Sequence, residues 1–129
     1  MSARFGSLVF HSRVRKCLSQ KTIAYKAGID PSYLASVERG RRPPPRRQVV
    51  EKILAALGMS SAEHALAIEA AAIDRLEPAI RDSEQDIPGA AVLVRLCNAL
   101  PYLSNAKLGV LSDVIGVLAE QPPLENTMR

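Results

Sequence analysis

Apolar residues recur three and four positions apart along most of this 129-residue chain, which is the period of helices with one buried face. No alternating run rich in valine and threonine indicates a β-strand. The sequence therefore predicts an all-α fold. The predicted helices span residues 2–17, 20–27, 30–39, 46–57, 62–76, 90–100 and 105–120.

Residues 20–39 stand out as two short helices joined by a tight turn. Ser19 can cap the first helix, because its hydroxyl can accept a free amide of the opening turn. Gly28 stands where that helix must stop, and glycine adopts a positive φ at little cost. Asp30 is a natural cap for the second helix, and Pro31 suits its first position, which needs no amide proton.

Proline and glycine divide the rest of the chain. Three prolines at positions 43–45 forbid helix after Gly40 and favour a stiff extended segment. Ser60 and Glu63 have the spacing of a capping box, so a new helix starts there. Glu77-Pro78 is expected to end or interrupt that helix. The polar residues 81–88 are interpreted as a linker, and residues 121–129 as a loose tail.

The segment around the two short helices carries a family resemblance. It resembles the lambda-repressor-like (Cro/repressor, or xenobiotic-response-element) regulators, whose members often have Leu-Ser-Gln before this unit and Glu-Arg-Gly after it. The corresponding residues here are Leu18-Ser19-Gln20 and Glu38-Arg39-Gly40, and the matching buried and turn positions are Ile23, Ala24, Gly28, Ile29, Leu34 and Val37. The resemblance covers about the first half of the chain. It implies a five-helix DNA-binding domain at residues 1–80, with its helix-turn-helix at residues 20–39.

Charge is distributed unevenly between the two halves of the chain. Residues 1–60 hold 12 Lys/Arg against 3 Asp/Glu, whereas residues 61–129 hold 5 against 10. The basic first half is suited to nucleic acid, and the acidic second half indicates a different role. No apolar run is long enough to predict a membrane span, and no secretion signal is recognised. Cys17 and Cys97 lack metal-ligand spacing. We expect a cytoplasmic, nucleoid-associated protein of bacterial or phage origin.

The resemblance assigns the second helix of the unit to the major groove of double-stranded DNA. Its outward positions hold small residues where longer polar ones often read bases, so direct readout is expected to be modest. Serine both donates and accepts hydrogen bonds, and proline and alanine can pack on thymine methyl groups. The candidate base-reading residues are Pro31, Ser32, Tyr33, Ala35 and Ser36.

Affinity is expected to depend mainly on phosphate contacts, with DNA shape contributing to specificity. Gln20 matches a family position that often touches phosphate and braces the reading side chain. Any single cation in this region could instead be an ordinary solvated charge, and Arg41 or Arg42 could enter a minor groove. The candidate phosphate ligands are Gln20, Lys21, Lys26, Arg39, Arg41, Arg42, Arg46 and Arg47.

The resemblance also suggests a structural ion pair. In the family, an arginine at the position of Arg13 commonly pairs with the glutamate that corresponds to Glu38. Such a pair would lock the first helix against the reading helix. The alternative is two independent surface charges.

The C-terminal helices, at residues 89–120, supply apolar surface beyond the needs of the first domain. A helical pair cannot bury both of its faces alone, so this segment is expected to pack across the two-fold axis of a homodimer. It could instead fold back on its own domain as additional core. The candidate interface residues are Leu93, Leu96, Leu100, Leu108, Leu111, Val114, Ile115 and Leu118.

Together these observations favour a sequence-specific transcriptional regulator, with a dimeric repressor as the preferred form. One alternative is an antitoxin that represses its own operon and binds a toxin through the C-terminal helices. Another is a protein-interaction or coactivator module built on the same fold. No nucleotide-binding, zinc-binding or hydrolase motif is present, so no catalytic residue, cofactor or metal is expected.

Overall fold

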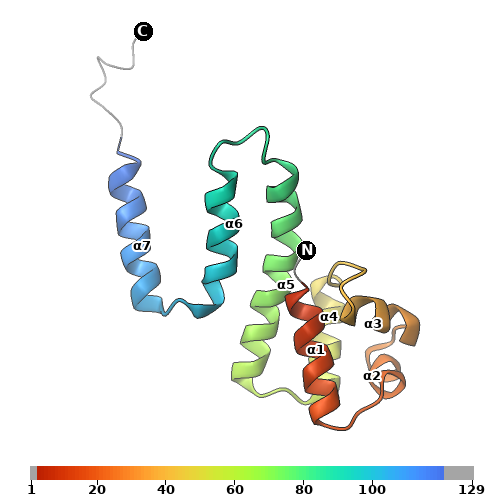
Figure 1. The fold of residues 1–129 in the computed structure, drawn as a ribbon. Coiled ribbons are helices and arrows are strands. Elements are labelled where there is room, and N and C mark those ends of the chain that lie inside the picture. The colour runs from red at the N-terminus through yellow and green to blue at the C-terminus, as the bar shows by residue number, and fades with distance from the viewer. Residues whose placement is uncertain (1–2, 121–129) are drawn as a thin grey trace.

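The computed structural model describes residues 3–120 and is entirely α-helical over that range. In Figure 1 the helices of the first part of the chain lie together, and the later helices extend away from them. In chain order the elements are α1 (Arg4–Arg15), α2 (Gln20–Ala27), α3 (Pro31–Glu38), α4 (Arg47–Leu57), α5 (Ser61–Asp82), α6 (Ala90–Ala99), the 3-10 helix η1 (Leu100–Tyr102) and α7 (Asn105–Leu118). The predicted all-α fold is confirmed. The tail predicted at residues 121–129 lies outside the described residues.

The local signals at the helix ends are confirmed. The hydroxyl of Ser19 accepts a hydrogen bond from the Thr22 amide, and Gly28 ends α2 with a φ of 70°. Asp30 caps α3, and Ser60 and Glu63 form a reciprocal capping box at the start of α5. Each cap satisfies amides that have no partner within their own helix, which fixes where the helix begins.

The core of the first domain is made of aliphatic side chains and one phenylalanine. Each of the helices α1 to α5 contributes apolar residues to this core, and α5 does so through alanines, while its larger Leu66 and Leu76 are about half exposed. The buried residues of this cluster are Phe5, Val9, Ile23, Ala24, Ala27, Leu34, Val37, Val50, Ile53, Leu54, Leu57, Ala67, Ala70 and Ala71.

Gly6 allows the closest contact between α1 and α3. A Cβ atom at residue 6 would overlap the backbone carbonyl oxygen of Val37 and crowd that of Glu38. Because glycine has no side chain, the backbones of the two helices meet directly at this point. The orientation of α3 therefore depends on α1.

Two predicted helix boundaries are wrong. The first helix ends at Arg15, before the predicted residue 17, and Cys17 adopts a φ of 57° in the turn. More importantly, α5 does not end at Glu77-Pro78 but continues through Pro78 to Asp82, over 22 residues. It therefore occupies the first two residues of the predicted linker and reaches from the first domain to the C-terminal helices.

The C-terminal helices differ in how they pack. Helix α6 lies along α5 and buries Ala90, Val94 and Cys97, whereas α7 has no buried residue and is separated from α5 by α6 (Figure 1). Leu108 and Leu111 of α7 are half-buried, and Val114 and Ile115 are about half exposed. Within residues 3–120, no helix has the length and apolar character needed to span a membrane.

Candidate nucleic-acid interface

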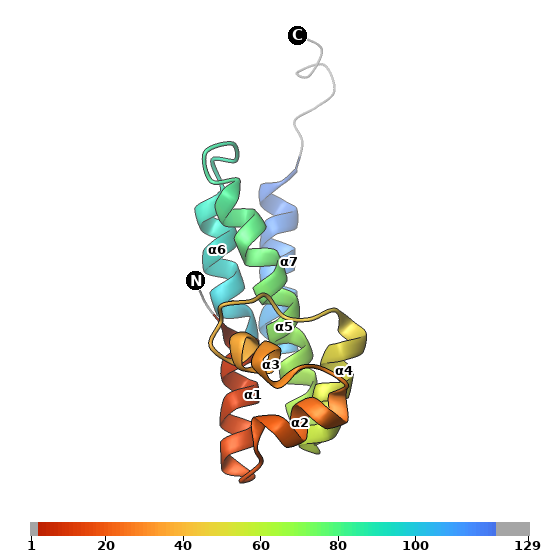
Figure 2. The ribbon, with the colours of Figure 1, turned by 90° about the vertical axis from the view of Figure 1, so that its right-hand side faces the viewer.

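Helices α2 and α3 and the segment after them form one surface, which Figure 2 shows from the front. Leu34 and Val37 of α3 are buried in the core, so the opposite side of the helix faces outward. Among the predicted base-reading residues, Pro31 and Ser32 are exposed, and Tyr33, Ala35 and Ser36 are half-buried. All five are therefore accessible on or beside the outward side of a short helix.

Glu38 joins α1, α2 and α3 through a set of hydrogen bonds. Arg13 donates to both carboxylate oxygens of Glu38, with its Nε 2.8 Å from Oε2 and its Nη2 3.0 Å from Oε1. Gln20 donates from its side-chain amide to Oε1 at 2.9 Å. The ion pair expected between Arg13 and Glu38 is thus present, with Glu38 only 8% exposed. A bidentate pair of this kind fixes orientation as well as distance.

Gln20 has a specific place in this arrangement. It is the first residue of α2, and one amide hydrogen of its side chain is used by Glu38. The amide nitrogen carries a second hydrogen, which remains free to donate to a phosphate oxygen. The side chain that Gln20 braces is that of Glu38, which is not one of the predicted base-reading residues, and its contact with phosphate stays a prediction.

The loop after α3 is attached to the domain at two points. The guanidinium of Arg42 lies over the ring of Tyr33, 5.9 Å from its centroid, which is within the range of a cation–π interaction. Further along, Arg75 of α5 donates a hydrogen bond to the carbonyl of Pro45, which is buried. Sequence reasoning missed Arg75, because its contact joins residues 30 positions apart.

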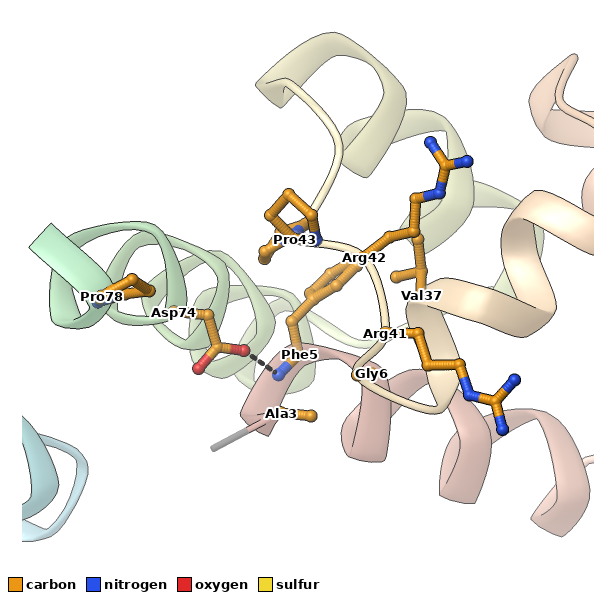
Figure 3. A pocket seen from close by; sticks show the side chains of 11 residues that line it. Ala3, Phe5, Gly6, Val37, Arg41, Arg42, Pro43, Asp74 and Pro78 are labelled. Atoms are coloured by element: carbon orange, nitrogen blue, oxygen red, sulfur yellow. Dashed lines mark hydrogen bonds between the residues drawn. The ribbon is translucent and has the colours of Figure 1, made fainter. Parts of the chain in front are cut away.

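Figure 3 shows how this loop presents its arginines. A cavity of about 260 Å³ lies behind the loop and is lined by Phe5, Pro43 and Pro78 among others. The side chains of Arg41 and Arg42 extend away from this cavity (Figure 3). Their charged ends are therefore directed to the outside of the protein.

The predicted phosphate-binding cations differ in their partners from the cations of α1 and its C-terminal end, whereas Lys52 and Arg75 also form no ion pair within residues 3–120. Arg4, Arg13, Arg15 and Lys16 each lie within 4.0 Å of a carboxylate. Of the seven predicted phosphate-binding cations, only Arg47 has such a partner among residues 3–120, at 3.7 Å from Glu51. The remaining six are exposed and form no ion pair within that part of the chain: Lys21, Lys26, Arg39, Arg41, Arg42 and Arg46.

Asp30 contributes a feature that the sequence had indicated only as a helix cap. Its Oδ1 accepts hydrogen bonds from the Ser32 amide at 2.8 Å and from the Ser32 hydroxyl at 2.5 Å. These two bonds hold the pKa of Asp30 below its usual value. The spacing Asp-x-Ser at a helix start could have suggested the second bond, since both side chains point to the same free end of the helix.

The comparisons with known proteins agree with this geometry. Residues 4–67 match the sequence model of a family described as a helix-turn-helix domain, of the Cro/repressor type. The matched segment contains α1 to α4 and the start of α5, so it includes every predicted DNA-contacting residue. No curated protein and no solved structure matches the chain.

Proposed function

From the premise that the chain belongs to the lambda-repressor-like helix-turn-helix DNA-binding family, we propose that it is a dimeric transcriptional repressor. In this proposal α3 enters the major groove of duplex DNA and the surrounding cations bind phosphates. The observation that carries it is the group of six exposed cations without an ion pair in residues 3–120, all on α2, the end of α3 and the loop that follows. Exposed cations without internal partners are available to replace counterions on DNA.

The base-reading part of the proposal uses the leading half of α3. Ser32 and Ser36 supply the hydroxyl groups, while Pro31 and Ala35 offer apolar contact to thymine methyl groups. Tyr33 lies at the edge of this surface beneath Arg42. With so few polar side chains on the helix, specificity is shared with DNA shape, which the arginines sense through the backbone.

The dimer is supported by the state of α7. This 14-residue helix is strongly apolar, yet none of its residues is buried by the rest of residues 3–120. A helix that is apolar on several faces requires cover. A second copy would cover it through α7 and the partly exposed leucines of α6, and one two-fold axis would then present two α3 helices to successive turns of DNA.

Repression follows from occupancy in this proposal. A dimer that covers two half-sites excludes polymerase from an overlapping promoter, and it acts on the nucleoid in the cytoplasm.

The uncovered α7 also favours a second candidate, an antitoxin that binds a small toxin through this helix. Co-purification of a second small protein with the chain expressed from its native operon would support that candidate.

The test of DNA binding is its dependence on salt. The affinity of the wild-type protein for duplex DNA is expected to fall steeply as salt rises. In the double variant Arg41→Ala/Arg42→Ala, the slope of log affinity against log salt should decrease by about 3.6 for a dimer, because two phosphate contacts are lost from each protomer and each removes about 0.9. Fluorescence anisotropy with a labelled random duplex measures both slopes.

The matched control is Arg95→Ala/Lys107→Ala, which removes the same charge from the exposed surface of α6 and α7. Its salt slope should equal that of the wild type, because those cations lie outside the proposed DNA interface. Equal slopes for the control and the Arg41/Arg42 variant would contradict the proposed surface. No binding of the wild type at low salt would overturn the proposal entirely.

A further inference from the structure

Arg4 occupies an unusual position at the junction of three helices. It is the first residue of α1, and its Nη1 donates to Asp74 Oδ1 at 3.1 Å and to Glu77 Oε1 at 3.0 Å, both on α5. Its Nη2 donates to the side-chain oxygen of Asn98 on α6. One guanidinium therefore ties the DNA-binding domain to the C-terminal helices.

The carboxylates that receive Arg4 are among the most buried polar groups of the described chain. Glu77 is 1% exposed and also accepts from Arg81 at 3.1 Å, while Asp74 accepts from the Phe5 amide at 2.8 Å (Figure 3). Two arginines thus neutralise two carboxylates. Buried carboxylates held by charged hydrogen bonds resist displacement, because moving the arginine would leave them unpaired.

The rest of the connection between the domains is also stiff. Helix α5 contributes Ala67, Ala70 and Ala71 to the core of the first domain and continues without a break to Asp74 and Glu77. Helix α6 packs against α5 through Ala90, Val94 and Cys97. The position of α6 relative to α3 is therefore set by helix packing and by the Arg4 contacts, and not by a flexible linker.

We propose that Arg4, through Asn98, is a positioning residue that sets the separation of the two DNA half-sites. This inference rests on the proposed dimer. When α6 and α7 meet across a two-fold axis, the angle between α6 and the first domain determines the distance between the two α3 helices. If this angle is fixed, the dimer binds DNA with one half-site separation, and if the angle varies, the dimer binds several separations.

The variant Asn98→Ala removes only the contact with α6 and leaves the Arg4 contacts to α5 in place. Arg4→Lys keeps the positive charge but loses the planar fork that reaches three acceptors at once. Both variants should select the same half-site sequence as the wild type. The share of duplexes at the preferred separation should fall at least about twofold. This is the effect expected from the smallest coupling free energies between residues of one hydrogen-bond network.

The experiment selects bound duplexes from a fully randomised pool, in parallel for the full-length wild type, Asn98→Ala, Arg4→Lys and Arg95→Ala, and sequencing gives the distribution of half-site separations. Arg95→Ala is the matched control, because Arg95 is exposed on α6 outside this network. Thermal unfolding of each protein shows whether it is folded. If Arg4→Lys does not fold, Asn98→Ala alone tests the inference.

The possible outcomes separate this inference from the proposed function. A sharp separation in the wild type that broadens in Asn98→Ala but not in Arg95→Ala supports the positioning role. An equally sharp separation in Asn98→Ala overturns that role and leaves the dimeric regulator intact. Selection of single half-sites by the wild type overturns the dimeric readout itself.

Discussion

At the leading end of α3, the Asp30 carboxylate accepts hydrogen bonds from both the amide and the hydroxyl of Ser32. An ionised carboxylate has no hydrogen to offer, so the serine must be the donor. The serine oxygen then has only lone pairs left, and the two side chains together present only acceptors. In the major groove, acceptors pair with the amino groups of adenine and cytosine. In the proposed interface, Ser32 would therefore discriminate between bases more strongly than an isolated serine.

Asp30→Asn tests whether Asp30 and Ser32 together present only hydrogen-bond acceptors to the bases. Asparagine caps helices about as well as aspartate, so α3 should remain folded. Its amide adds donors, so the base preference opposite Ser32 should move from adenine or cytosine toward guanine or thymine. A bidentate contact contributes about 1–3 kcal/mol, so a single hydrogen bond, at about half of that, should change the preference by about tenfold or less. Selection from a random duplex pool measures the preference.

Ser32→Ala is the companion variant for the same experiment. It removes the hydroxyl without adding a donor, so it should weaken the preference for adenine or cytosine and create no new one. If all three proteins select the same base at every half-site position, then Asp30 and Ser32 do not read DNA.

Helix α5 continues through a residue that ordinarily ends a helix. Pro78 has no N–H, so the carbonyl of Asp74 one turn earlier loses its donor, at a cost of about 3 kcal/mol relative to alanine. Contacts on both sides of the proline offset this cost. Arg4 binds Asp74 and Glu77, and Arg81 binds Glu77 from the far side of the proline. Tertiary contacts have here overridden a local preference.

Pro78→Ala should therefore stabilise the protein. The restored helical hydrogen bond outweighs the loss of proline's restriction of the unfolded chain, which is worth about 0.4–1 kcal/mol. The net gain is about 2 kcal/mol, measured by urea or thermal unfolding. Pro43→Ala, in the loop outside any helix, is the control and should give no gain. A lower melting temperature for Pro78→Ala would contradict the claim that Pro78 destabilises α5.

The difference between α5 and the other helices explains what the sequence could predict. The caps Ser19, Asp30 and Ser60 act within three residues, so their spacing alone is enough to place them. The surface position of the DNA-contacting residues followed from the helical period and the family resemblance. In contrast, the contacts of Arg4 and Arg75 join residues 30 or more positions apart. No local pattern contains them, and they are what keeps α5 intact and the arginine loop attached.

Across the whole molecule, charge and apolar surface are separated along the chain. The helix-turn-helix side carries the six unpaired cations of the proposed DNA interface. The acidic second half carries α7, whose exposed apolar residues are Val110, Val114, Ile115, Val117 and Leu118. The acidic part would be repelled by DNA, so this division favours one orientation of the protein on a duplex. It also leaves the apolar helix free for another protein chain.

Ile115→Asp tests the proposed dimer at this scale. A charge in the apolar stripe of α7 should convert a dimer to a monomer, because an unpaired charge in a dry interface is strongly unfavourable. The protomer should remain folded, since no residue of α7 is buried by the rest of residues 3–120. Sedimentation velocity measures the mass, and helical circular dichroism with thermal unfolding reports the fold.

Asn105→Asp adds the same charge to the same helix outside the stripe and should leave the dimer intact. Equal masses for the wild type and Ile115→Asp would mean that α7 does not form the interface. A wild type that stays monomeric at high concentration would rule out the homodimer.

The backbone contact at Gly6 affects how mutations in such a protein should be interpreted. Because α1 rests directly on the carbonyl groups at the end of α3, even one added methyl group at residue 6 must push the DNA-facing helix out of place. If the protein represses as proposed, a screen for loss of repression should therefore recover substitutions at Gly6, which is not one of the predicted DNA-contacting residues. Such a hit would report a displaced helix, so a map of inactivating substitutions would extend beyond the footprint of the operator.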